Sequence, residues 1–342
     1  MNAATHTLGI DIAKGNFEVN LRTLQSGQAR HSCSFPNNLQ GFGALQRWLI
    51  QQGITQAPNL HACLESTSRY GDALAGWLHS QGYQVSMVNP RRTRHYADSQ
   101  LCRTITDRID AAIIADFCVD QRDKLLLWEP LPSQHRQLQD LTRTRAALVE
   151  HHDGLANLLE SATGLARKAV QRQQANLQRE IERLELQIKK LLDQIVGSAF
   201  QTQVALADSV PGVGLLTAVM VLAELPPLDK IAHAHQAIAL FGLDPKSKTS
   251  GTSVKTPARI SKMGSKRGRR ALYMPALVAL RYNPSIRAMG QRLSAKGRSG
   301  KYVVVAAMRK LLRQIFGVVK SGKPFDPHWS HSPTTRHLQE VV

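Results

Sequence analysis

Residues 104–118 read TITDRIDAAIIADFC, and this stretch decides how the rest of the chain is interpreted. Apolar residues recur through it at helical spacing, which predicts an amphipathic helix of about four turns. Two acids, Asp107 and Asp110, lie beside the apolar stripe near the N-terminal end of this helix. The stripe predicted to be buried comprises Ile105, Ile109, Ala112, Ile113 and Phe117.

Asp107 and Asp110 are three positions apart, so a helix places both carboxylates on one face. Two acids this close repel each other unless a cation lies between them, and Mg²⁺ suits hard oxygen ligands of this kind. The alternative is a pair of solvated acids, which the helix macrodipole favours near an N-terminus. For an isolated pair of acids, solvation is the commoner explanation. Whether Asp107 and Asp110 bind a metal therefore depends on which other acids the chain brings near them.

The overall composition is that of an ordinary globular protein. With 342 residues, 42% of them hydrophobic and 20% charged, the chain is expected to form two or three domains. No apolar run approaches the ~20 residues that cross a bilayer, and the N-terminal MNAATHTLGI lacks a secretory signal, so we expect no membrane association. The cysteines show no C-x-x-C spacing, which predicts free thiols in a reducing cytoplasm rather than a zinc site or disulfides. They are Cys33, Cys63, Cys102 and Cys118.

Charge is distributed very unevenly along the chain. The segment 246–323 holds 20 Lys and Arg and no Asp or Glu, which leaves 24 basic and 25 acidic residues for the remainder. Positive charges packed on one surface repel one another unless a polyanion neutralises them. This segment therefore indicates a nucleic-acid partner. An anionic membrane is the weaker alternative, because the apolar periodicity of this segment is typical of a packed domain.

The first hundred residues alternate strands with helices. Strands are predicted at 7–12, 17–21, 61–64 and 84–88, with a turn at 13–16 and helices at 42–50 and 66–80. This order predicts a sheet covered by helices. Asp11 then lies on the first strand and Glu65 ends a later one, so both are expected to meet Asp107 and Asp110 at one edge of the sheet. The competing acids nearby are predicted to be solvated; they are Asp98, Asp116, Asp120 and Asp123.

Residues 130–200 read as long helices. Leu177, Ile181, Leu184, Ile188, Leu191 and Ile195 follow heptad spacing for about two and a half repeats. This pattern fits a coiled-coil arm, or an antiparallel helical hairpin formed with the preceding helix that carries Leu138 and Leu158. In either case the segment is predicted to be a spacer or dimerisation arm.

The remaining chain combines a glycine turn, a polar loop and a basic path. The sequence SVPGVGLLTAVMVLAEL at 209–225 fits equally a helix-hairpin-helix element, whose glycines approach phosphate, and a plain turn into a core helix. Residues 248–255 read as a polar loop whose serines are either loop formers or nucleophiles for a phosphodiester. Helices are predicted at 271–280 and 302–320, and the chain beyond Pro327 as a loosely ordered tail. The cations predicted to contact nucleic acid are Lys248, Lys255, Arg259, Lys262, Lys266, Arg267, Arg269 and Arg270.

An acid on the first strand, another on a later strand and a pair on a following helix is the arrangement of RNase H and RuvC-like nucleases. The motifs GIDIAK, CLEST, TDRIDAAIIADF, VPGVG, SGTSV, SKMGSKRGRRALYMPA and VKSGKPFD together resemble the DEDD-type insertion-sequence transposases, relatives of the pilin-gene invertase. The resemblance implies an α/β RuvC-like catalytic domain at 1–128, a helical coiled-coil arm at 129–200, a mainly α-helical basic transposase domain at 201–330 and a tail at 331–342.

The same resemblance implies a catalytic mechanism. Asp11, Glu65, Asp107 and Asp110 would bind Mg²⁺, two ions per site, and Ser250 would become covalently linked to the cleaved strand, with Ser253 as second choice. The implied partners are donor and target double-stranded DNA, a noncoding bridge RNA, and further copies of the chain in a dimer or tetramer.

Such a recombinase would work in the cytoplasm, associated with the nucleoid. The alternatives are a junction-resolving RuvC-like nuclease that uses the four acids alone, a pilin-type DNA invertase, and a nucleic-acid-binding regulator with an inactive metal site.

Overall fold

The computed structural model describes residues 4–23, 30–65, 69–102, 104, 106–250 and 254–327 of the 342. It divides the chain into two compact units, Met1–Leu131 and Pro132–Val342, and each is described by itself. Ile105, Ser253 and the predicted tail lie outside the described residues. No helix in the described ranges is long and apolar enough to cross a membrane.

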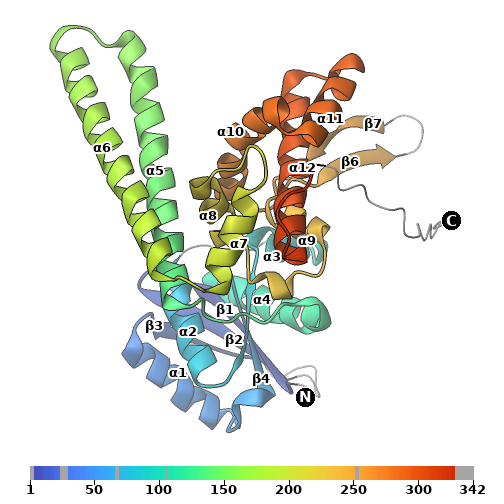
Figure 1. The fold of residues 1–342 in the computed structure, drawn as a ribbon. Helices are drawn as coiled ribbons and strands as arrows, with labels where there is room; N and C mark the ends of the chain where they lie inside the picture. Colours follow the sequence, from blue (N-terminus) through green and yellow to red (C-terminus); the bar gives the residue numbers. More distant parts are fainter. Residues whose placement is uncertain are drawn as a thin grey trace. The chain divides into compact units, whose positions relative to one another are not determined.

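A five-stranded mixed sheet forms the centre of the first unit (Figure 1). Its spatial order is β3-β2-β1-β4-β5, with β1, β2 and β3 antiparallel and β1, β4 and β5 parallel. The predicted hairpin is confirmed, since β1 pairs with β2 along its whole length. The strands are β1 (His6–Ile12), β2 (Asn16–Thr23), β3 (Arg30–Pro36), β4 (Leu60–Glu65) and β5 (Gln84–Val88).

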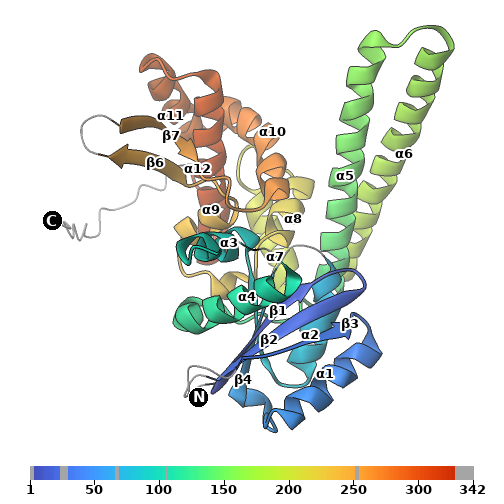
Figure 2. The ribbon, with the colours of Figure 1, turned by 180° about the vertical axis from the view of Figure 1, so that it is seen from behind.

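Helices cover both faces of this sheet (Figures 1 and 2). One face carries Leu8, Ile10 and Leu64 and packs against helices α1 and α2 in a large apolar core. The other face, which includes Cys63 and Val88, packs against α4. The helices of this unit are α1 (Leu39–Gln51), α2 (Asp72–Ser80), α3 (Pro90–Ser99) and α4 (Asp107–Gln121), with short 3-10 turns at Ala57–Asn59, Arg69–Gly71 and Arg122–Lys124.

Helix α4 differs from its prediction in which residues it buries. Ala111, Ile114, Ala115 and Cys118 are fully buried, whereas Ile109, Ala112 and Ile113 are only partly buried, so the predicted stripe is wrong in phase. The reason is a close contact with β1: a Cβ on Gly9 would lie 2.2 Å from the Ala111 carbonyl oxygen. Two alanines let the helix backbone approach the sheet where isoleucines would hold it away.

The corrected phase has a consequence for the acids. Counting back from Ile114 by three or four residues leads to Ala111 and Asp110, and from Ala111 by four to Asp107. The buried face of α4 therefore continues into both carboxylates at its N-terminal end. The two acids lie on the face that points at the sheet.

The second unit begins with a long helical hairpin. Helices α5 (Ser133–Ser161) and α6 (Gly164–Gln194) run antiparallel and side by side (Figures 1 and 2). The heptad positions Ile181, Leu184 and Ile188 are buried in this pairing within one chain, as the hairpin alternative predicted. A coiled coil between chains remains a proposal.

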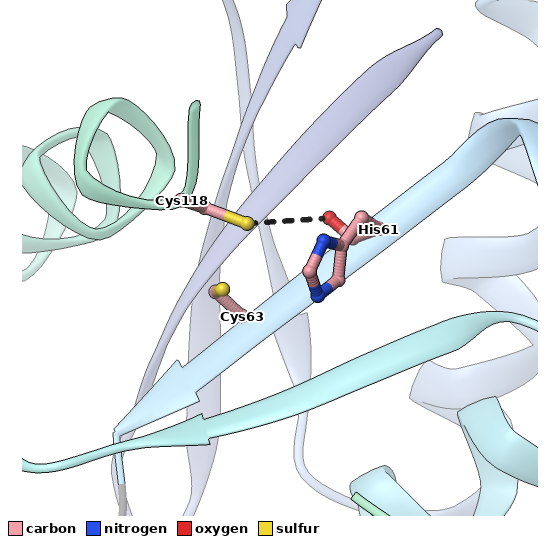
Figure 3. Close-up of side chains that lie close together, drawn as sticks. All are labelled: His61, Cys63 and Cys118. Atoms are coloured by element: carbon pink, nitrogen blue, oxygen red, sulfur yellow. Dashed lines mark hydrogen bonds between the residues drawn. The ribbon is translucent and has the colours of Figure 1, made fainter. Parts of the chain in front are cut away.

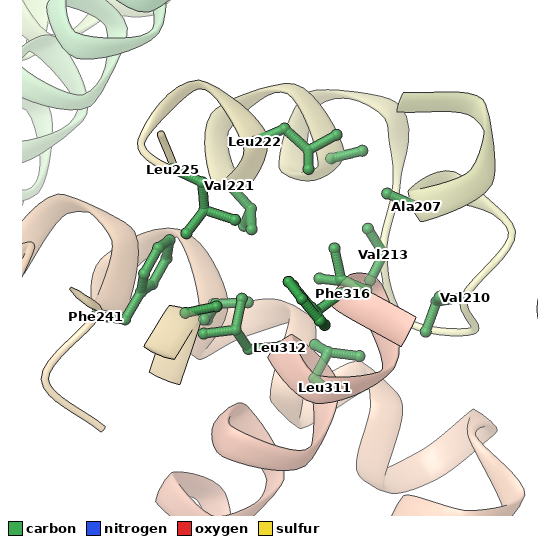
Figure 4. Close-up of a cluster of buried hydrophobic side chains, with 14 of the residues drawn as sticks. Ala207, Val210, Val213, Val221, Leu222, Leu225, Phe241, Leu311, Leu312 and Phe316 are labelled. Atoms are coloured by element: carbon green, nitrogen blue, oxygen red, sulfur yellow. The ribbon is translucent and has the colours of Figure 1, made fainter. Parts of the chain in front are cut away.

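The remaining helices of the second unit surround α12. Their core joins residues from the base of the hairpin to Phe241, Leu311, Leu312 and Phe316 (Figure 4). Gly212 of the VPGVG turn has φ +102°, and a Cβ there would lie 2.7 Å from that of Ala279, so this glycine serves core packing. The helices are α7 (Ala199–Asp208), α8 (Leu215–Ala223), α9 (Ala234–Leu240), α10 (Lys266–Tyr282), α11 (Pro284–Ala295) and α12 (Gly300–Ser321), with a 3-10 turn at Leu228–Lys230.

The predicted polar loop at 248–255 is instead largely an antiparallel hairpin, β6 (Pro245–Ser250) and β7 (Val254–Ile260). Thr249 pairs with Lys255 and Ser250 with Val254. The prediction was wrong because composition emphasised Ser and Gly, while Thr249, Val254 and Thr256 are β-branched residues that favour strands. For Lys248, Ser250 and Lys255 only the backbone path is described.

Candidate active site

Four carboxylates converge where two parallel strands and one helix meet. Ile10 of β1 pairs with Leu64 of β4, so Asp11 and Glu65, each one residue further on, emerge at the same edge of the sheet. Side chains alternate along a strand, and Asp11 shares the face of Gly9, which contacts α4. The first turn of α4 adds Asp107 and Asp110 from that side.

The electrostatics confirm that these acids face one another. The pKa of Asp11 is raised to about 6, chiefly by burial and then by the negative charges of Asp110, Asp107 and Glu65. Burial also raises the pKa of Asp110, and the neighbouring Asp107 adds to that shift. Glu65 has a pKa raised by burial and by Asp110. The four acids are therefore electrostatic neighbours, while the metal-binding and catalytic roles predicted for them stay predictions.

The N-terminus of α4 is built to place its acids. Thr106 caps the helix, and its hydroxyl oxygen accepts a hydrogen bond from the Ile109 N–H at 3.3 Å. Asp107 is consequently the first helical residue, where the helix dipole stabilises negative charge. Stabilisation by the helix dipole and a shared site with Asp11 are therefore compatible explanations for this pair. The dipole favours acids at the helix N-terminus, and the tertiary fold directs these two toward Asp11.

Helix α3 forms a further wall of the site, which sequence reasoning missed. The buried Thr93 hydroxyl donates to the Glu65 carboxylate and lowers its pKa against the effect of burial. The next residue, Arg94, carries a positive charge that lowers the pKa of Asp110. Arg94 also lines a cavity of about 310 Å³ with Arg91, His95 and Asp98. The run RRTRH after Asn89-Pro90 was the available signal, because it places several cations on one short helix.

Two of the acids predicted to be solvated have other roles. Asp116 is wrongly predicted, because it accepts hydrogen bonds from the buried Arg22 guanidinium at 2.6 and 3.0 Å. Asp120 accepts one from the Tyr96 hydroxyl at 2.5 Å. Asp98 and Asp123 are exposed, as predicted. None of these four contributes to the shifted pKa of Asp11, so the carboxylate site is distinct from them.

The donor set fits a hard divalent cation. Four carboxylates supply oxygen ligands and formal negative charge, and their mutual repulsion shows in the raised pKa values of Asp11, Glu65 and Asp110. Arg94 lowers the pKa of Asp110, but its single positive charge does not balance four acids. A site of this kind is stabilised by metal binding, since oxygen-only ligation suits Mg²⁺.

Several cations predicted to contact nucleic acid form ion pairs with acids of the second unit. Arg270 and Lys266 pair with Glu150 of α5 at 2.5 and 3.7 Å. Arg267 pairs at 3.1 Å with Glu224, a nearly buried acid whose pKa the neighbouring arginines lower against the opposing effect of burial.

Arg269 has a structural role. Its guanidinium donates to the carbonyls of Phe241 and Gly264 at 2.9 and 3.1 Å, so it ties α10 to the turn before β6. Arg259 and Lys262 are exposed. The cations predicted to contact nucleic acid thus include one that ties backbone carbonyls together and several exposed ones, some of which are ion-paired within the unit.

Comparison with known proteins covers most of the chain. Residues 8–163 match a family described as "Transposase", and residues 204–291 match "Transposase IS116/IS110/IS902 family". The pilin gene-inverting proteins of Moraxella lacunata and Moraxella bovis are each 31% identical over 327 residues, which is 93% of this chain and 97% of the relative. The chain belongs to this transposase family.

The two family matches coincide with the two chemical features of the chain. The first transposase match includes all four carboxylates, and the second includes the β6–β7 hairpin, whose first strand ends at Ser250. An insertion element IS110 protein of Streptomyces coelicolor, described as uncharacterized, is 27% identical over 139 residues, which is 41% of this chain and 33% of that protein. The family comprises DNA-recombining enzymes, and this member carries the acid site within it.

Proposed function

We propose that this transposase family member cuts, covalently holds and rejoins DNA strands, using the four-acid site of a RuvC-like domain and a serine of its second unit. The single observation that carries the proposal is the convergence of Asp11, Glu65, Asp107 and Asp110, with a pKa of about 6 for Asp11. Isolated surface acids do not shift one another in this way. The mixed sheet order β3-β2-β1-β4-β5 supports the RuvC-like assignment.

In this proposal each residue of the site has a defined task. The four carboxylates hold the metal, and Thr93 fixes the orientation of Glu65 through its hydrogen bond. Two Mg²⁺ ions bound there would supply the charge that activates the attacking oxygen and stabilises the leaving one. Arg94 lies beside Asp110, where it can contact a phosphate of the bound strand.

The serine step exchanges one phosphorus–oxygen bond for another. The Ser250 hydroxyl oxygen bonds to the phosphorus as the strand's own oxygen leaves, and the serine proton ends on water or on that leaving oxygen. Attack by the new strand end then reverses the exchange and frees Ser250. The energy of the cleaved bond is thereby kept in the covalent intermediate.

The proposed partners follow from the charge distribution. An acid-free segment with 20 cations fits donor and target double-stranded DNA, and also a structured bridge RNA that would supply sequence choice by base pairing. We further propose that the α5–α6 hairpin serves as a dimerisation arm of a dimer or tetramer. The active sites would then combine acids and serines from different copies.

Two other functions remain as alternatives. Site-specific inversion is favoured by the likeness over 93% of the chain to two proteins named for inverting a pilin gene. A RuvC-like nuclease would need only the acids, because hydrolysis by water requires no serine. An invertase and a nuclease would both use the metal site. An invertase rejoins the cut ends in reversed orientation, and a nuclease leaves them unjoined, whereas a transposase joins them to a new site.

Three full-length variants separate a serine recombinase from a nuclease: Ser250→Ala, Ser253→Ala and Asp110→Asn. Each is incubated with Mg²⁺, supercoiled DNA carrying the element ends, and RNA transcribed from those ends. A recombinase using Ser250 loses the protein–DNA adduct and strand exchange in Ser250→Ala and keeps both in Ser253→Ala, whereas Asp110→Asn loses all cutting. Undiminished cutting by both serine variants, with no adduct in the wild type, would establish the nuclease instead.

A further inference from the structure

Below the carboxylates, the same strand and helix bring three metal-binding side chains together. His61 and Cys63 lie on β4 and Cys118 on α4, and all three are buried, at 2%, 0% and 0% exposure (Figure 3). The imidazole nitrogen and the two sulfurs that they offer lie within 4.8 Å of one another. His61 and Cys63 are two residues apart on a strand, so both point to the face that α4 covers.

The hydrogen bonds fix which nitrogen of His61 is available. Ser86 Oγ donates its one proton to the Leu126 carbonyl at 2.9 Å, so it can only accept from His61 Nε2, which lies 2.9 Å away. Nε2 therefore carries the ring proton, and Nδ1 presents a bare lone pair. Nδ1 is fully buried and has no hydrogen-bond partner among the described residues, and the ring lies beside both sulfurs (Figure 3).

An unpaired buried nitrogen is costly, and at His61 it occurs in a group whose two other members are thiols. Leaving a buried acceptor unpaired costs roughly 1–3 kcal/mol. A ligated ion removes that cost at Nδ1 and uses both sulfurs at once. The Ser86 contact is of the kind that orients metal-binding histidines by holding the nitrogen not used for ligation.

We infer that His61, Cys63 and Cys118 form a structural zinc site. Nitrogen and sulfur donors select a soft or borderline ion rather than Mg²⁺. Two thiolates and Zn²⁺ sum to zero charge, whereas Cu⁺ on the same ligands would leave a net negative charge in the core, which burial penalises. These three side chains would fill three of the four tetrahedral positions around the ion. The four cysteines are free thiols, as their spacing predicted, and the proposed zinc site goes beyond that prediction.

The proposed zinc site lies between the two elements that carry most of the active-site acids. β4 ends in Glu65 and α4 begins with Asp107 and Asp110, so an ion between Cys63 and Cys118 ties together the two elements that carry three of the four acids. The zinc would hold the separation between Glu65 and Asp110 without touching either. This site does not depend on the proposed recombinase chemistry.

Metal content of the full-length protein tests the inference. The chain is purified under reducing conditions, supplied with one equivalent of Zn²⁺, dialysed against a weak chelator and analysed by inductively coupled plasma mass spectrometry. We expect about one zinc per chain, consistent with a preformed three-residue site. Cys118→Ala and His61→Ala should lose this zinc, while the matched controls Cys33→Ser and Cys102→Ser, whose thiols lie outside the cluster, should retain it. Asp110→Asn should also retain it, which separates this site from the acids.

A spectroscopic measurement on the wild-type chain keeps the inference falsifiable if the cluster variants fail to fold. Replacement of zinc by Co²⁺ should produce thiolate-to-cobalt charge-transfer absorption, which carboxylate ligands cannot give. Zinc in the wild type together with this absorption supports the site. Wild-type protein that retains no zinc, lacks the cobalt band, or carries a Cys63–Cys118 disulfide in its intact mass overturns it.

Discussion

In the candidate active site, the acids proposed to bind metal also destabilise the metal-free fold. Asp11 is partly buried beside three other acids, and its pKa of about 6 records the free-energy cost of keeping it ionised there. Arg94 and Thr93 act in the other direction, because each lowers the pKa of one neighbouring carboxyl. Such a site is expected to be unstable without its cation and to regain stability when one binds.

Replacing Asp11 by Asn should stabilise the metal-free protein at pH 7.5 by on the order of 1 kcal/mol, after allowance for solvent screening of a partly exposed group. A carboxyl pKa raised from 3.8 to about 6 means that the folded chain binds more protons than the unfolded chain between those values. Stability from this group is therefore present at low pH and is lost as pH rises through that window. Thermal unfolding in EDTA should show the gain at pH 7.5 and none near pH 3.5.

The control for Asp11→Asn is Asp123→Asn, because the Asp123 side chain is 93% exposed and should show no such pH-dependent gain. An equal gain at both pH values would mean that Asn improves packing rather than relieving repulsion. A loss of stability at pH 7.5 would contradict the electrostatic account of the site.

Replacing Arg94 by Ala should slow strand cleavage at saturating DNA by about tenfold to a hundredfold, because a charged contact beside the metal site is lost. DNA affinity should change little, and Arg94→Lys should recover part of the rate by restoring the charge. Single-turnover cleavage and a parallel binding titration measure the two effects separately. Arg92→Ala is the control, since the Arg92 guanidinium lies over the Phe117 ring at 5.1 Å and its loss should affect stability rather than rate.

At the scale of elements, the close contact between β1 and α4 sets the geometry of the site. Gly9 lies against the backbone of Ala111 and Ala115, and this contact fixes both the depth and the rotation of the helix. The rotation in turn directs Asp107 and Asp110 at Asp11. A helix placed further from the sheet would keep all its hydrogen bonds and still lose the site.

Gly9→Ala should therefore destabilise the first unit by about 2–4 kcal/mol, since an added Cβ would lie 2.2 Å from two backbone atoms of α4 that cannot move independently. Chemical denaturation measures the loss, and cleavage activity should fall with it. Gly15→Ala is the matched control, because no atom lies within 4 Å of its Cβ position. Equal stability of the two variants would show that α4 does not depend on this contact.

At the scale of the whole molecule, charge is divided between the two units. The first unit contains the four-acid site, while the acid-free segment 246–323 lies entirely in the second. Ion pairs to Glu150 and Glu224 neutralise part of that segment from within the unit. The cations left exposed are the ones available to a nucleic-acid backbone.

DNA affinity should fall steeply with salt, and Arg259→Ala should reduce the slope of log affinity against log salt by about one, as expected for one lost phosphate contact. Arg269→Ala should leave that slope unchanged and lower thermal stability, because Arg269 holds the Phe241 and Gly264 carbonyls. Binding titrations at several salt concentrations distinguish the two variants. A flat salt response in the wild type would contradict the second unit as the docking surface.

The sequence by itself determined strands β1, β2, β4 and β5 and the long helices, and it singled out the four acids, but it missed β3 and the β6–β7 hairpin. These features depend on local periodicity and residue type, as the β1–β2 hairpin and the positions of Asp11 and Glu65 at strand ends illustrate. It also determined that the C-terminal half is basic, since charge can be counted without a fold.

Only the tertiary structure decided how these elements face one another. The phase of α4 was misjudged because Ala111 and Ala115 are buried by contact with Gly9 and not by their hydrophobicity. The RRTRH run showed that α3 is basic, but neither the contact of Thr93 with Glu65 nor the cluster of His61, Cys63 and Cys118 could be predicted, because the partners lie tens of residues apart along the chain. The physical reason is that burial, pKa and ligand geometry arise from neighbours in space, which spacing along the chain does not specify.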